Sequence, residues 1–448
     1  MTAIARARSL PMWRSLAVRD FRLLWGSEAV SLIGDYFHIV ALAWLVLDLT
    51  KSGLALGTVL IAIGVPRAVL ILPFGVLADR LPARTMMVAA HLARGVLVGA
   101  MAALVVTHNA TIPLLALLGI LFGIADAAFV PAQQAFLPRT LASDQLSSGN
   151  ALLQGTMQLT GIIAPPIAGA AIAVVGTGTA FVIDSLSFFA AAAIVLMISA
   201  RGVPTARRPV ATDETPTEPV DLGAAPAVSA SEADAPAPAT SFVAQLREGI
   251  AYVLADPGLR LTLLISLVMN FALGGPSAVG MPWLAEIRFD AGPIGLGLLT
   301  AGYAVGALGG TVLAGNATSQ AQGRRLLATL GVSGVAMLVV ALAPSLWVVF
   351  GALGVMGGLI GYTNIVALSW LQRRVDPAMI GRVMAIVMLM GFGITPLSYA
   401  LAGWLLDVNA TALFAGAAMI IILTTAFAAA SNFPVIFDAT EAKPQPAA

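Results

Sequence analysis

The sequence contains no cysteine and only three histidines among its 448 residues. The absence of cysteine excludes disulfides, thiol catalysis and metals bound by cysteine. All three histidines, His38, His91 and His108, lie in the first quarter of the chain, which argues against a multi-histidine metal site further along. We therefore expect neither a metal nor another cofactor. The short pattern Gly331–Gly334 resembles a serine-hydrolase motif, but a serine nucleophile needs a base and no histidine follows His108. An intramembrane enzyme is thus the disfavoured alternative.

Charge is also scarce, because 10% of the residues are charged and 59% are hydrophobic. Soluble domains carry about 25% charged residues. A soluble particle of this size would have too few polar groups to cover its surface, so a lipid bilayer must be the solvent for much of the chain. The net charge is +1 and the cations are spread along the chain, which indicates no nucleic-acid partner.

Long apolar runs recur along the whole chain, and each is close to the ~20 residues that a helix needs to cross a bilayer. They lie at roughly 23–49, 53–77, 86–107, 111–131, 148–175, 179–199, 260–284, 294–315, 326–343, 347–371, 383–405 and 411–430. The runs do not alternate between polar and apolar residues, which favours helices over barrel strands. The sequence predicts an all-α integral membrane protein with twelve transmembrane helices in two six-helix bundles.

Composition divides this layout into segments. Residues 201–241 are rich in proline, alanine, serine and acids and cannot bury enough apolar surface to become ordered. Apolar residues between 242 and 254 fall on one helical face, which predicts a helix lying on the membrane surface. The predicted segments are a cytoplasmic N-terminal segment (1–22), an N-terminal bundle (23–200), a disordered cytoplasmic linker (201–241), an amphipathic surface helix (242–258), a C-terminal bundle (259–431) and a cytoplasmic tail (432–448).

Basic residues predict the orientation, because they are enriched in cytoplasmic loops. Of the 23 lysines and arginines, Arg67 and Arg94 lie within spans, while Lys51 and Arg288 lie in loops on one side. The other 19 lie in segments on the opposite side. We expect a multi-pass protein of the plasma membrane with both termini in the cytoplasm.

The loop between the second and third apolar runs carries Gly75, Asp79, Arg80 and Arg84. Their spacing resembles the G-x-x-x-D-R-x-x-x-R loop signature of the major facilitator superfamily. The resemblance implies a gating loop, in which the aspartate and the arginines pair with helix ends or with charges across the domain boundary. The alternative is a cytoplasmic loop with incidental charges.

Further motifs are similar to one exporter branch of that superfamily, which includes enterobactin-type siderophore exporters and macrolide-efflux proteins. The matching segments are Phe21–Trp25, Ser31–Asp35, Ala41–Leu45, Pro131–Pro138 and Asn150–Leu152. Gly161, Pro165, Pro166 and Gly169 resemble the fifth-span motif of antiporters, with Pro165 in place of the usual glycine. One departure is Asp126, which stands in the fourth span where many drug–proton antiporters have an arginine.

This resemblance implies a secondary active transporter that exports a small, lipophilic molecule of the drug, macrolide or siderophore class by alternating access, driven by proton influx. Its expected partners are the small-molecule substrate, protons and lipid, and we expect a monomer. Import or symport by the same fold is the main alternative. An ATP-driven pump is disfavoured because no phosphate-binding loop occurs, and a channel because no filter or charged ring is evident.

Ionisable residues within spans are the candidates for chemistry, since each costs about 2.5–3.5 kcal/mol at a span centre. Asp35 and Arg67 each lie sixteen residues from Lys51, so both are predicted near the bilayer midplane. We hypothesise that Asp35 changes protonation during transport and that Arg67 modulates it. The alternative is a static ion pair between two helices.

Other ionisable residues surround this predicted pair. Glu28 and His38 fall on the helical face of Asp35 and are expected to assist it, and Arg94 and Asp126 are predicted at matching depths. Asp184, Glu28 and His91 are expected near the membrane interfaces. The spans after the linker contain no comparable charges. Methionines and aromatic residues there could line an apolar cavity, although ordinary packing explains most of that group. The group consists of Met269, Phe271, Met281, Trp283, Tyr303, Met356, Tyr362, Trp370, Met388 and Met390.

Overall fold

The computed structural model describes residues 15–142, 145–199, 242–315, 321–376 and 379–438. The predicted linker, 201–241, lies outside this part of the chain. The described residues are mostly helical and contain no strand. The main helices are α2 (Arg19–Thr50), α3 (Gly53–Arg80), α4 (Ala83–Val106), α5 (Ile112–Phe136), α6 (Leu146–Leu196), α7 (Phe242–Ala255), α8 (Pro257–Gly275), α10 (Gly292–Gly315), α11 (Gln322–Leu342), α12 (Leu346–Arg374), α13 (Ile380–Ala430) and α14 (Phe433–Asp438).

Ten helical stretches in the described residues are long and apolar enough to cross a membrane. Two of them, α6 and α13, are 51 residues long, and each is broken at a single residue with non-helical torsions. The break in α6 is Gly176, whose φ of 82° suits glycine, and the break in α13 is Asn409. Because these two helices each supply two spans, the ten stretches correspond to twelve spans, as predicted.

Local sequence sets the ends of the helices. The side chain of Ser52 accepts a hydrogen bond from the backbone N–H of Ala55 and so caps α3. Asp256 caps α8 by accepting from the N–H groups of Gly258 and Leu259, and Pro257 occupies the first helical turn, where its missing N–H costs nothing. The seventh span continues beyond α8 through two π-helical turns, Pro276–Gly280 and Leu284–Arg288, on either side of the short α9, Met281–Trp283.

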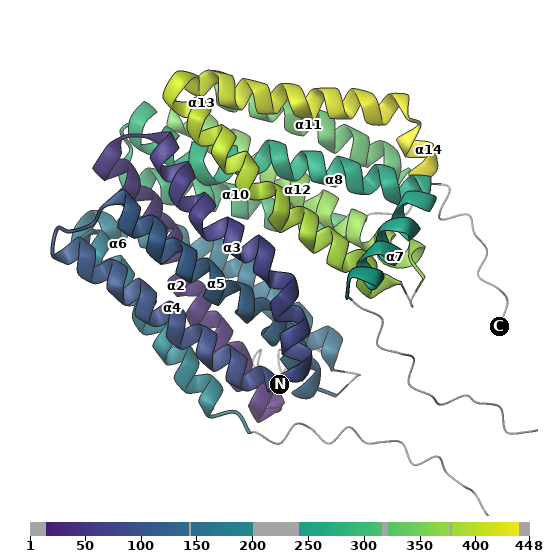
Figure 1. The fold of residues 1–448 in the computed structure, drawn as a ribbon. Coiled ribbons are helices and arrows are strands. Elements are labelled where there is room, and N and C mark those ends of the chain that lie inside the picture. The colour runs from purple at the N-terminus through teal and green to yellow at the C-terminus, as the bar shows by residue number, and fades with distance from the viewer. Residues whose placement is uncertain (1–14, 143–144, 200–241, 316–320, 377–378, 439–448) are drawn as a thin grey trace, which may run out of the picture.

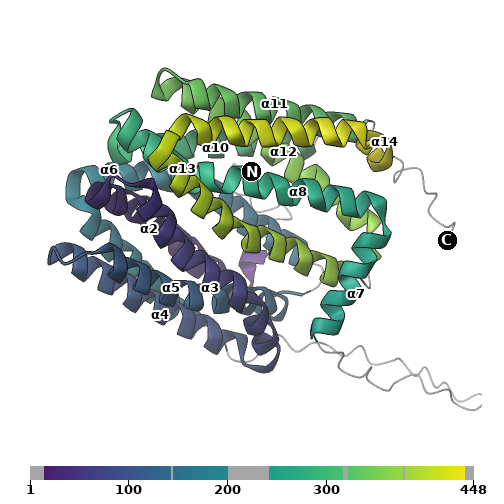
Figure 2. The same cartoon turned by 45° about the horizontal axis from the view of Figure 1, so that its top comes forward.

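The spans form two bundles, which we call the N bundle (α2–α6) and the C bundle (α8–α13). Figures 1 and 2 show the purple-to-blue helices of the N bundle beside the green-to-yellow helices of the C bundle. Within the N bundle, α2 and α4 pack on α6, and α3 packs on α5. Within the C bundle, α10 packs on α12, and α8 and α11 pack on α13. Many large apolar side chains, such as Val174 and Leu313, are exposed on the outer surfaces, as expected for helices solvated by lipid.

The bundles meet along two seams that match each other. In the first seam, α6 packs on α10, and the backbone of Gly297 approaches the carbonyl group of Pro165. In the second, α3 packs on α13, where Gly57 approaches the carbonyl oxygen of Tyr399 and Gly64 approaches Pro396. The fifth span thus contacts the eighth, and the eleventh contacts the second, which is the pattern expected of two repeats related about the membrane normal.

Polar contacts between the bundles gather at the end of the spans where Lys51 lies, which we call the Lys51 end. Lys51 Nζ lies 2.6 Å from Glu286 Oε1. The carboxylate of Asp407 on α13 accepts hydrogen bonds from Ser52 Oγ (2.6 Å), Gly53 N (2.6 Å) and Leu54 N (3.3 Å), and so caps α3 from the other bundle. We call these contacts the inter-bundle latch.

The opposite end of the spans, where α6 ends and α7 begins, is the linker end. The bundles separate toward it, as the diverging courses of α3 and α13 in Figure 1 show. The polar contacts that form the inter-bundle latch thus lie at the Lys51 end, while α3 and α13 diverge toward the linker end.

The residues predicted as a tail begin with the short helix α14, which packs on α11. Phe437 is buried, its ring stacks on Trp370, and its carbonyl oxygen accepts a hydrogen bond from the Trp370 indole. The carboxylate of Asp438 accepts a hydrogen bond from Gly323 N at the start of α11. Helix α7 (Phe242–Ala255) covers most of the surface helix predicted for residues 242–258, and its position on a membrane surface stays a prediction.

Candidate functional site

An ion triad lies inside the N bundle, formed by Arg67 on α3, Arg94 on α4 and Asp126 on α5. Asp126 Oδ2 lies 3.0 Å from Arg67 Nη1, and Asp126 Oδ1 lies 3.2 Å from Arg94 Nη1. Arg94 is only 2% exposed, whereas the side chain of Arg67 is 32% exposed. Because each residue comes from a different helix, the triad ties three spans together at one depth.

Aromatic rings surround the buried arginine of this triad. The guanidinium carbon of Arg94 lies 4.2 Å from the ring centroid of Phe129 and 4.4 Å from that of Phe188. Arg94 Nη2 lies 3.1 Å from His91 Nδ1, and His91 is fully buried. The rings and the imidazole replace part of the hydration that the guanidinium would have in water. Arg94 is therefore held in one position by contacts on all sides.

A second pair lies beside the triad. His38 Nδ1 on α2 lies 3.2 Å from Asp184 Oδ2 on α6, and the imidazole stacks on Phe122 with 4.9 Å between centroids. Both side chains are buried. Gly34 makes this approach possible, because a Cβ at that position would collide with the side chains of Ser187 and Asp184. The glycine one residue before Asp35 thus lets a buried acid pack against α2.

Asp35 and Glu28 complete the cluster from α2, and both are partly buried. The charged groups that influence Asp35 electrostatically are Arg94, Asp184, Asp126 and His38. Within the described residues, Asp35 makes no hydrogen bond and no ion pair. Glu28 lies within the electrostatic influence of Arg94, Asp35 and Gln133.

The N-bundle cluster therefore contains two guanidinium groups, four carboxyl groups and two imidazoles. The members are Arg67, Arg94, Glu28, Asp35, Asp126, Asp184, His38 and His91. If all the carboxyl groups were ionised and the imidazoles neutral, the cluster would carry two excess negative charges. Uncompensated charge within a membrane is costly, and buried groups relieve that cost by binding protons. The arrangement can therefore take up and release protons.

The cluster differs from the sequence-based expectation in one respect. Arg67 contacts Asp126, not Asp35, because α3 packs along α5 and touches α2 little. Equal depth in the membrane does not determine which neighbour a side chain faces. Asp184 and His91 are both fully buried within the N bundle, and their placement near the interfaces stays a prediction. Arg94 and Asp126, predicted at one depth, are in contact.

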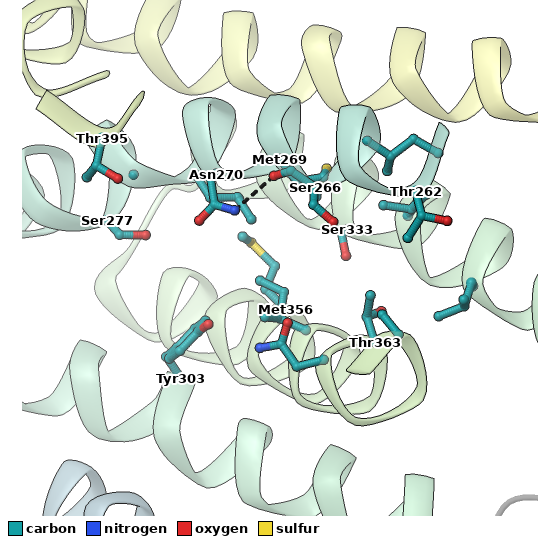
Figure 3. A pocket seen from close by; sticks show the side chains of 18 of the residues that line it. Thr262, Ser266, Met269, Asn270, Ser277, Tyr303, Ser333, Met356, Thr363 and Thr395 are labelled. Atoms are coloured by element: carbon teal, nitrogen blue, oxygen red, sulfur yellow. Dashed lines mark hydrogen bonds between the residues drawn. The ribbon is translucent and has the colours of Figure 1, made fainter. Parts of the chain in front are cut away.

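The C bundle contains a cavity of about 390 Å³ with a different character (Figure 3). Its polar lining consists of hydroxyl and amide side chains, and none of its lining residues is charged. These polar residues are Thr262, Ser266, Asn270, Ser277, Tyr303, Ser333, Thr363, Asn364 and Thr395. Met269 and Met356 add adaptable apolar surface, and with Tyr303 they are the cavity-lining members of the methionine and aromatic group noted in the sequence.

A smaller hollow of about 340 Å³ shares lining residues with this cavity and with the charged cluster. Arg67 lines it together with Phe392, whose ring centroid lies 4.4 Å from the guanidinium carbon. Asn270 and Thr395 line both hollows. The exposed face of Arg67 therefore lies between the acid-rich cluster of the N bundle and the uncharged cavity of the C bundle.

The polar lining of this cavity was missed in the sequence, where an apolar cavity was considered, although a signal for it is present. Thr262, Ser266 and Asn270 are spaced four residues apart, so they form one polar stripe along α8. Such a stripe within an apolar span predicts a face turned away from lipid. The π-helical turn that begins at Pro276 adds Ser277 to the same lining.

The predicted gating loop lies at the linker end. Arg84 donates hydrogen bonds to the carbonyl oxygens of Val195 and Leu196, the last residues of α6. It therefore binds a helix C-terminus, but within its own bundle and not across the domain boundary. Arg80 is exposed, and Gly75 has open space where a Cβ would lie. The side chain of Asp79 is outside the described part.

The predicted antiporter-like motif lies in the first part of α6, at the seam with α10. A Cβ at Gly169 would overlap the carbonyl group of Pro293, and the carbonyl of Pro165 abuts Gly297. A Cβ at Gly161 would lie 2.7 Å from the Tyr36 hydroxyl. Pro165 is buried and Pro166 contacts the backbone at Gly297. These residues let the two bundles approach closely along this seam.

Comparison with known proteins gives one family and several distant relatives. Residues 24–396 match the model of the Major Facilitator Superfamily. The chain is 23% identical over 373 residues to macrolide efflux protein A of Streptococcus pyogenes, covering 82% of this chain and 84% of that protein. The relative's name assigns efflux to that protein.

Solved structures with similar folds are more distant in sequence. The crystal structure of nucleoside transporter NupG has a TM-score of 0.65 at 12% identity, covering 95% of this chain and 100% of that one. An inward-facing bacterial homologue of the iron transporter ferroportin has a TM-score of 0.66 at 16% identity, covering 95% and 99%. At these identities the similarity concerns the fold alone.

Proposed function

Because the chain belongs to the Major Facilitator Superfamily and is thus a membrane transporter and not an enzyme, we propose that it exports small, lipophilic molecules by alternating access and that proton entry drives the export. Similarity to a macrolide efflux protein over 82% of the chain supports the outward direction. The drug, macrolide and siderophore classes are the expected substrates. Import by the same fold is the alternative to be tested against it.

The one-sided contact between the bundles supports alternating access. The basic residues orient the linker end toward the cytoplasm, so in this conformation the cavity faces the cytoplasm and the Lys51 end is closed. A substrate would enter from the cytoplasm or the inner leaflet. Rocking of the bundles would then break the inter-bundle latch and form new contacts at the linker end.

The proposed cycle requires the latch to stabilise the conformation closed at the Lys51 end and still to break when the bundles rock. Its bonds are charge-assisted, since Asp407 accepts from two backbone N–H groups and one hydroxyl, and Lys51 pairs with Glu286. The hydrogen bond to Glu286 raises the pKa of Lys51. Lys51 and Asp407 are exposed, although Glu286 is only 9% exposed, so water can reach these contacts when the bundles separate.

The excess of carboxyl groups in the N-bundle cluster is the observation that carries the proton-coupling proposal. Asp126 has two arginine partners, whereas Asp35 has no direct partner and is partly exposed. Asp35 is therefore the residue placed best to exchange protons with the central space. Arg67, which contacts both Asp126 and the hollow beside the cavity, can pass a change in cluster charge to the substrate.

The direct test is a flux measurement in everted membrane vesicles, whose cytoplasmic face is outward. We expect a proton gradient to drive uptake of a panel of macrolides, catecholate siderophores and lipophilic drugs, and each substrate to release protons detected by a pH-sensitive dye. Asp35→Asn should abolish coupling, while Asp48→Asn, which removes an exposed acid on the same helix, should not. Unchanged coupling in Asp35→Asn would remove Asp35 from the mechanism, and substrate loss from these vesicles would favour import.

A further inference from the structure

Arg67 of the ion triad also contacts the C bundle. Its guanidinium carbon lies 4.4 Å from the ring centroid of Phe392 on α13, while its Nη1 lies 3.0 Å from Asp126 Oδ2 on α5. Arg67 Nε is buried and makes no hydrogen bond within the described residues. A cation over an aromatic face is attracted by the negative charge of the π-system. Arg67 is therefore held between an acid of its own bundle and a ring of the other.

This contact lies where close packing between α3 and α13 ends. Gly64 on α3 approaches Pro396 of α13, and Arg67 follows three residues later. Gly75 lies on the same face of α3 as Gly64, because eleven residues make about three helical turns. No atom lies within 4 Å of the Cβ position of Gly75, so close packing stops between these two glycines. Arg67 and Phe392 thus meet near the level from which α3 and α13 diverge (Figure 1).

The backbone of α13 is weakened beside this ring. Pro396 has no N–H group, so the carbonyl oxygen of Phe392 lacks its usual partner four residues further along the helix. Gly391 and Gly393 flank the ring, and both have open space at their Cβ positions. Glycine and proline both disfavour a straight helix. The stretch from Gly391 to Pro396 is therefore a part of α13 that can bend at low cost.

We propose that Phe392 is a positioning residue, through which the charge state of the ion triad controls the position of α13 relative to α3. When Asp126 is ionised, its carboxylate neutralises much of the charge of Arg67. When Asp126 is neutral, the whole charge of Arg67 acts on the ring and stabilises the conformation of this structure. The inference rests on the proposed function, because it gives this contact a step in the proton-coupled cycle.

The neighbours of Arg67 assign the change of charge to the acids. Among the described residues, Arg94 lies on the other side of Asp126, and Tyr399 of α13 lines the hollow together with Arg67. The two arginines keep their protons, so the acid between them is the group that changes charge. Asp35 interacts electrostatically with Asp126, so a proton bound at Asp35 also changes the field at the triad. Proton uptake by the cluster thus strengthens the contact between the bundles.

Distances between spin labels, measured by double electron–electron resonance in lipid nanodiscs, test this inference without substrate or ion gradient. The full chain has no cysteine, so Leu81→Cys and Gln372→Cys, at exposed positions near the linker ends of α3 and α12, accept one label each. We expect Phe392→Leu to lower the population with the longer distance, relative to the shorter, about threefold to tenfold. Phe392→Tyr keeps the aromatic face and should stay within about twofold of the unaltered chain. An unchanged ratio in Phe392→Leu would overturn the proposal.

Combined variants show whether the ring acts through the charge. In an Arg67→Met background, Phe392→Leu should change the ratio by less than about twofold, because no cation remains over the ring. In an Asp126→Asn background the same change should have a larger effect than in the unaltered chain, since no carboxylate offsets Arg67. Phe427→Leu is the control, because it removes an exposed ring of the same helix and should leave the ratio unchanged. Equal effects of Phe392→Leu in all three backgrounds, or no increase in Asp126→Asn, would overturn the inference.

Flux in everted vesicles connects this contact with coupling. Phe392→Leu should lower the number of protons moved per substrate, whereas Phe427→Leu should not, and an unchanged number in Phe392→Leu would remove Phe392 from the mechanism. The spin-label measurements need neither a substrate nor a gradient, so they are independent of transport. A charge-dependent ring effect without proton-driven export would refute the proposed function alone, whereas proton-driven export without that effect would refute only the role of Phe392.

Discussion

The two bundles have the same arrangement of six spans but different interiors. The N bundle holds charged residues in its interior, where Arg94, Asp126 and Asp184 are all buried. In the described part of the C bundle, Asp256 before α8 pairs with Arg374 at the end of α12, and Arg382 near the start of α13 pairs with Glu248 of the neighbouring α7. One fold can thus divide its work, with proton-binding groups in one half and uncharged ligand-binding groups in the other.

The largest effect should come from removing the buried guanidinium of the N bundle. Arg94→Met keeps much of the side-chain volume but leaves Asp126 with one partner and removes the charge that offsets Asp35 and Glu28. Loss of one member of a buried ion pair costs about 3–5 kcal/mol. We expect a strongly lowered unfolding temperature and reduced yield of monodisperse protein, measured by size-exclusion chromatography after heating in detergent.

Two controls separate charge from packing in this experiment. Arg94→Met combined with Asp126→Leu should recover part of the loss, because the acid is removed together with its partner. Asn270→Leu in the C bundle should change stability little, since Asn270 is exposed to the cavity. If Arg94→Met alone were as stable as the unaltered protein, the ion pairs inside the N bundle would not be needed for its stability.

The division between the bundles was partly visible in the sequence. Span positions follow from apolar runs, and the breaks at Gly176 and Asn409 coincide with turn-forming residues. The concentration of ionisable residues before the linker also follows from the sequence alone. Depth within a span can be counted from its ends, so Arg94 and Asp126 could be expected at the same level.

Neighbours across helices could not be derived in the same way. Whether Arg67 meets Asp35 or Asp126 depends on which spans pack together, and that is decided by close contacts such as Gly123 against the backbone of Ile63. The burial of Asp184 likewise depends on Gly34, a residue far away in the sequence. A single sequence does not contain these pairings, because they arise from shape complementarity between distant segments.

An intermediate effect should come from the glycines that hold the C bundle together. A Cβ at Gly310 on α10 would overlap the carbonyl group of Gly358 on α12, so Gly310→Ala must push the helices apart. Overpacking of this kind costs about 1–3 kcal/mol. We expect a lower unfolding temperature in detergent, although the proton-binding groups of the N bundle are unchanged.

The neighbouring glycine provides a matched control. Gly309 has no atom within 4 Å of its Cβ position, so Gly309→Ala should be neutral or slightly stabilising through the better helix propensity of alanine. Equal destabilisation by the two alanines would show that helix packing is not the cause. If both variants were as stable as the unaltered protein, close backbone approach would not hold α10 to α12. The stability of the uncharged C bundle would then need another explanation.

The smallest effect concerns a C-bundle charge at the linker end. Burial acts to raise the pKa of Asp256, but the hydrogen bonds from Arg374 and from the backbone N–H groups of Leu259 and Gly258 outweigh it, so the pKa lies below its usual value. A depressed pKa contributes stability above the unfolded-state value of about 3.9, and this contribution is lost as the pH falls through the folded-state pKa. Asp256→Asn should therefore be less stable than the unaltered protein at pH 7 and should approach it below about pH 4.

The stability lost in Asp256→Asn can be separated from the loss of the helix cap by comparison with Asp256→Ala. Asparagine still caps a helix, so Asp256→Asn isolates the charge and should cost about 1 kcal/mol or less, as for other partly exposed pairs. Asp256→Ala removes the cap as well and should cost about 1 kcal/mol more at every pH. Thermal unfolding of the unaltered protein and the two variants between pH 3 and pH 7 measures the contribution of the charge and that of the cap. The difference in unfolding temperature between the unaltered protein and Asp256→Asn could stay constant with pH. That result would mean that the ion pair with Arg374 contributes no charge-dependent stability, and that the C bundle depends on ion pairs even less than its uncharged interior indicates.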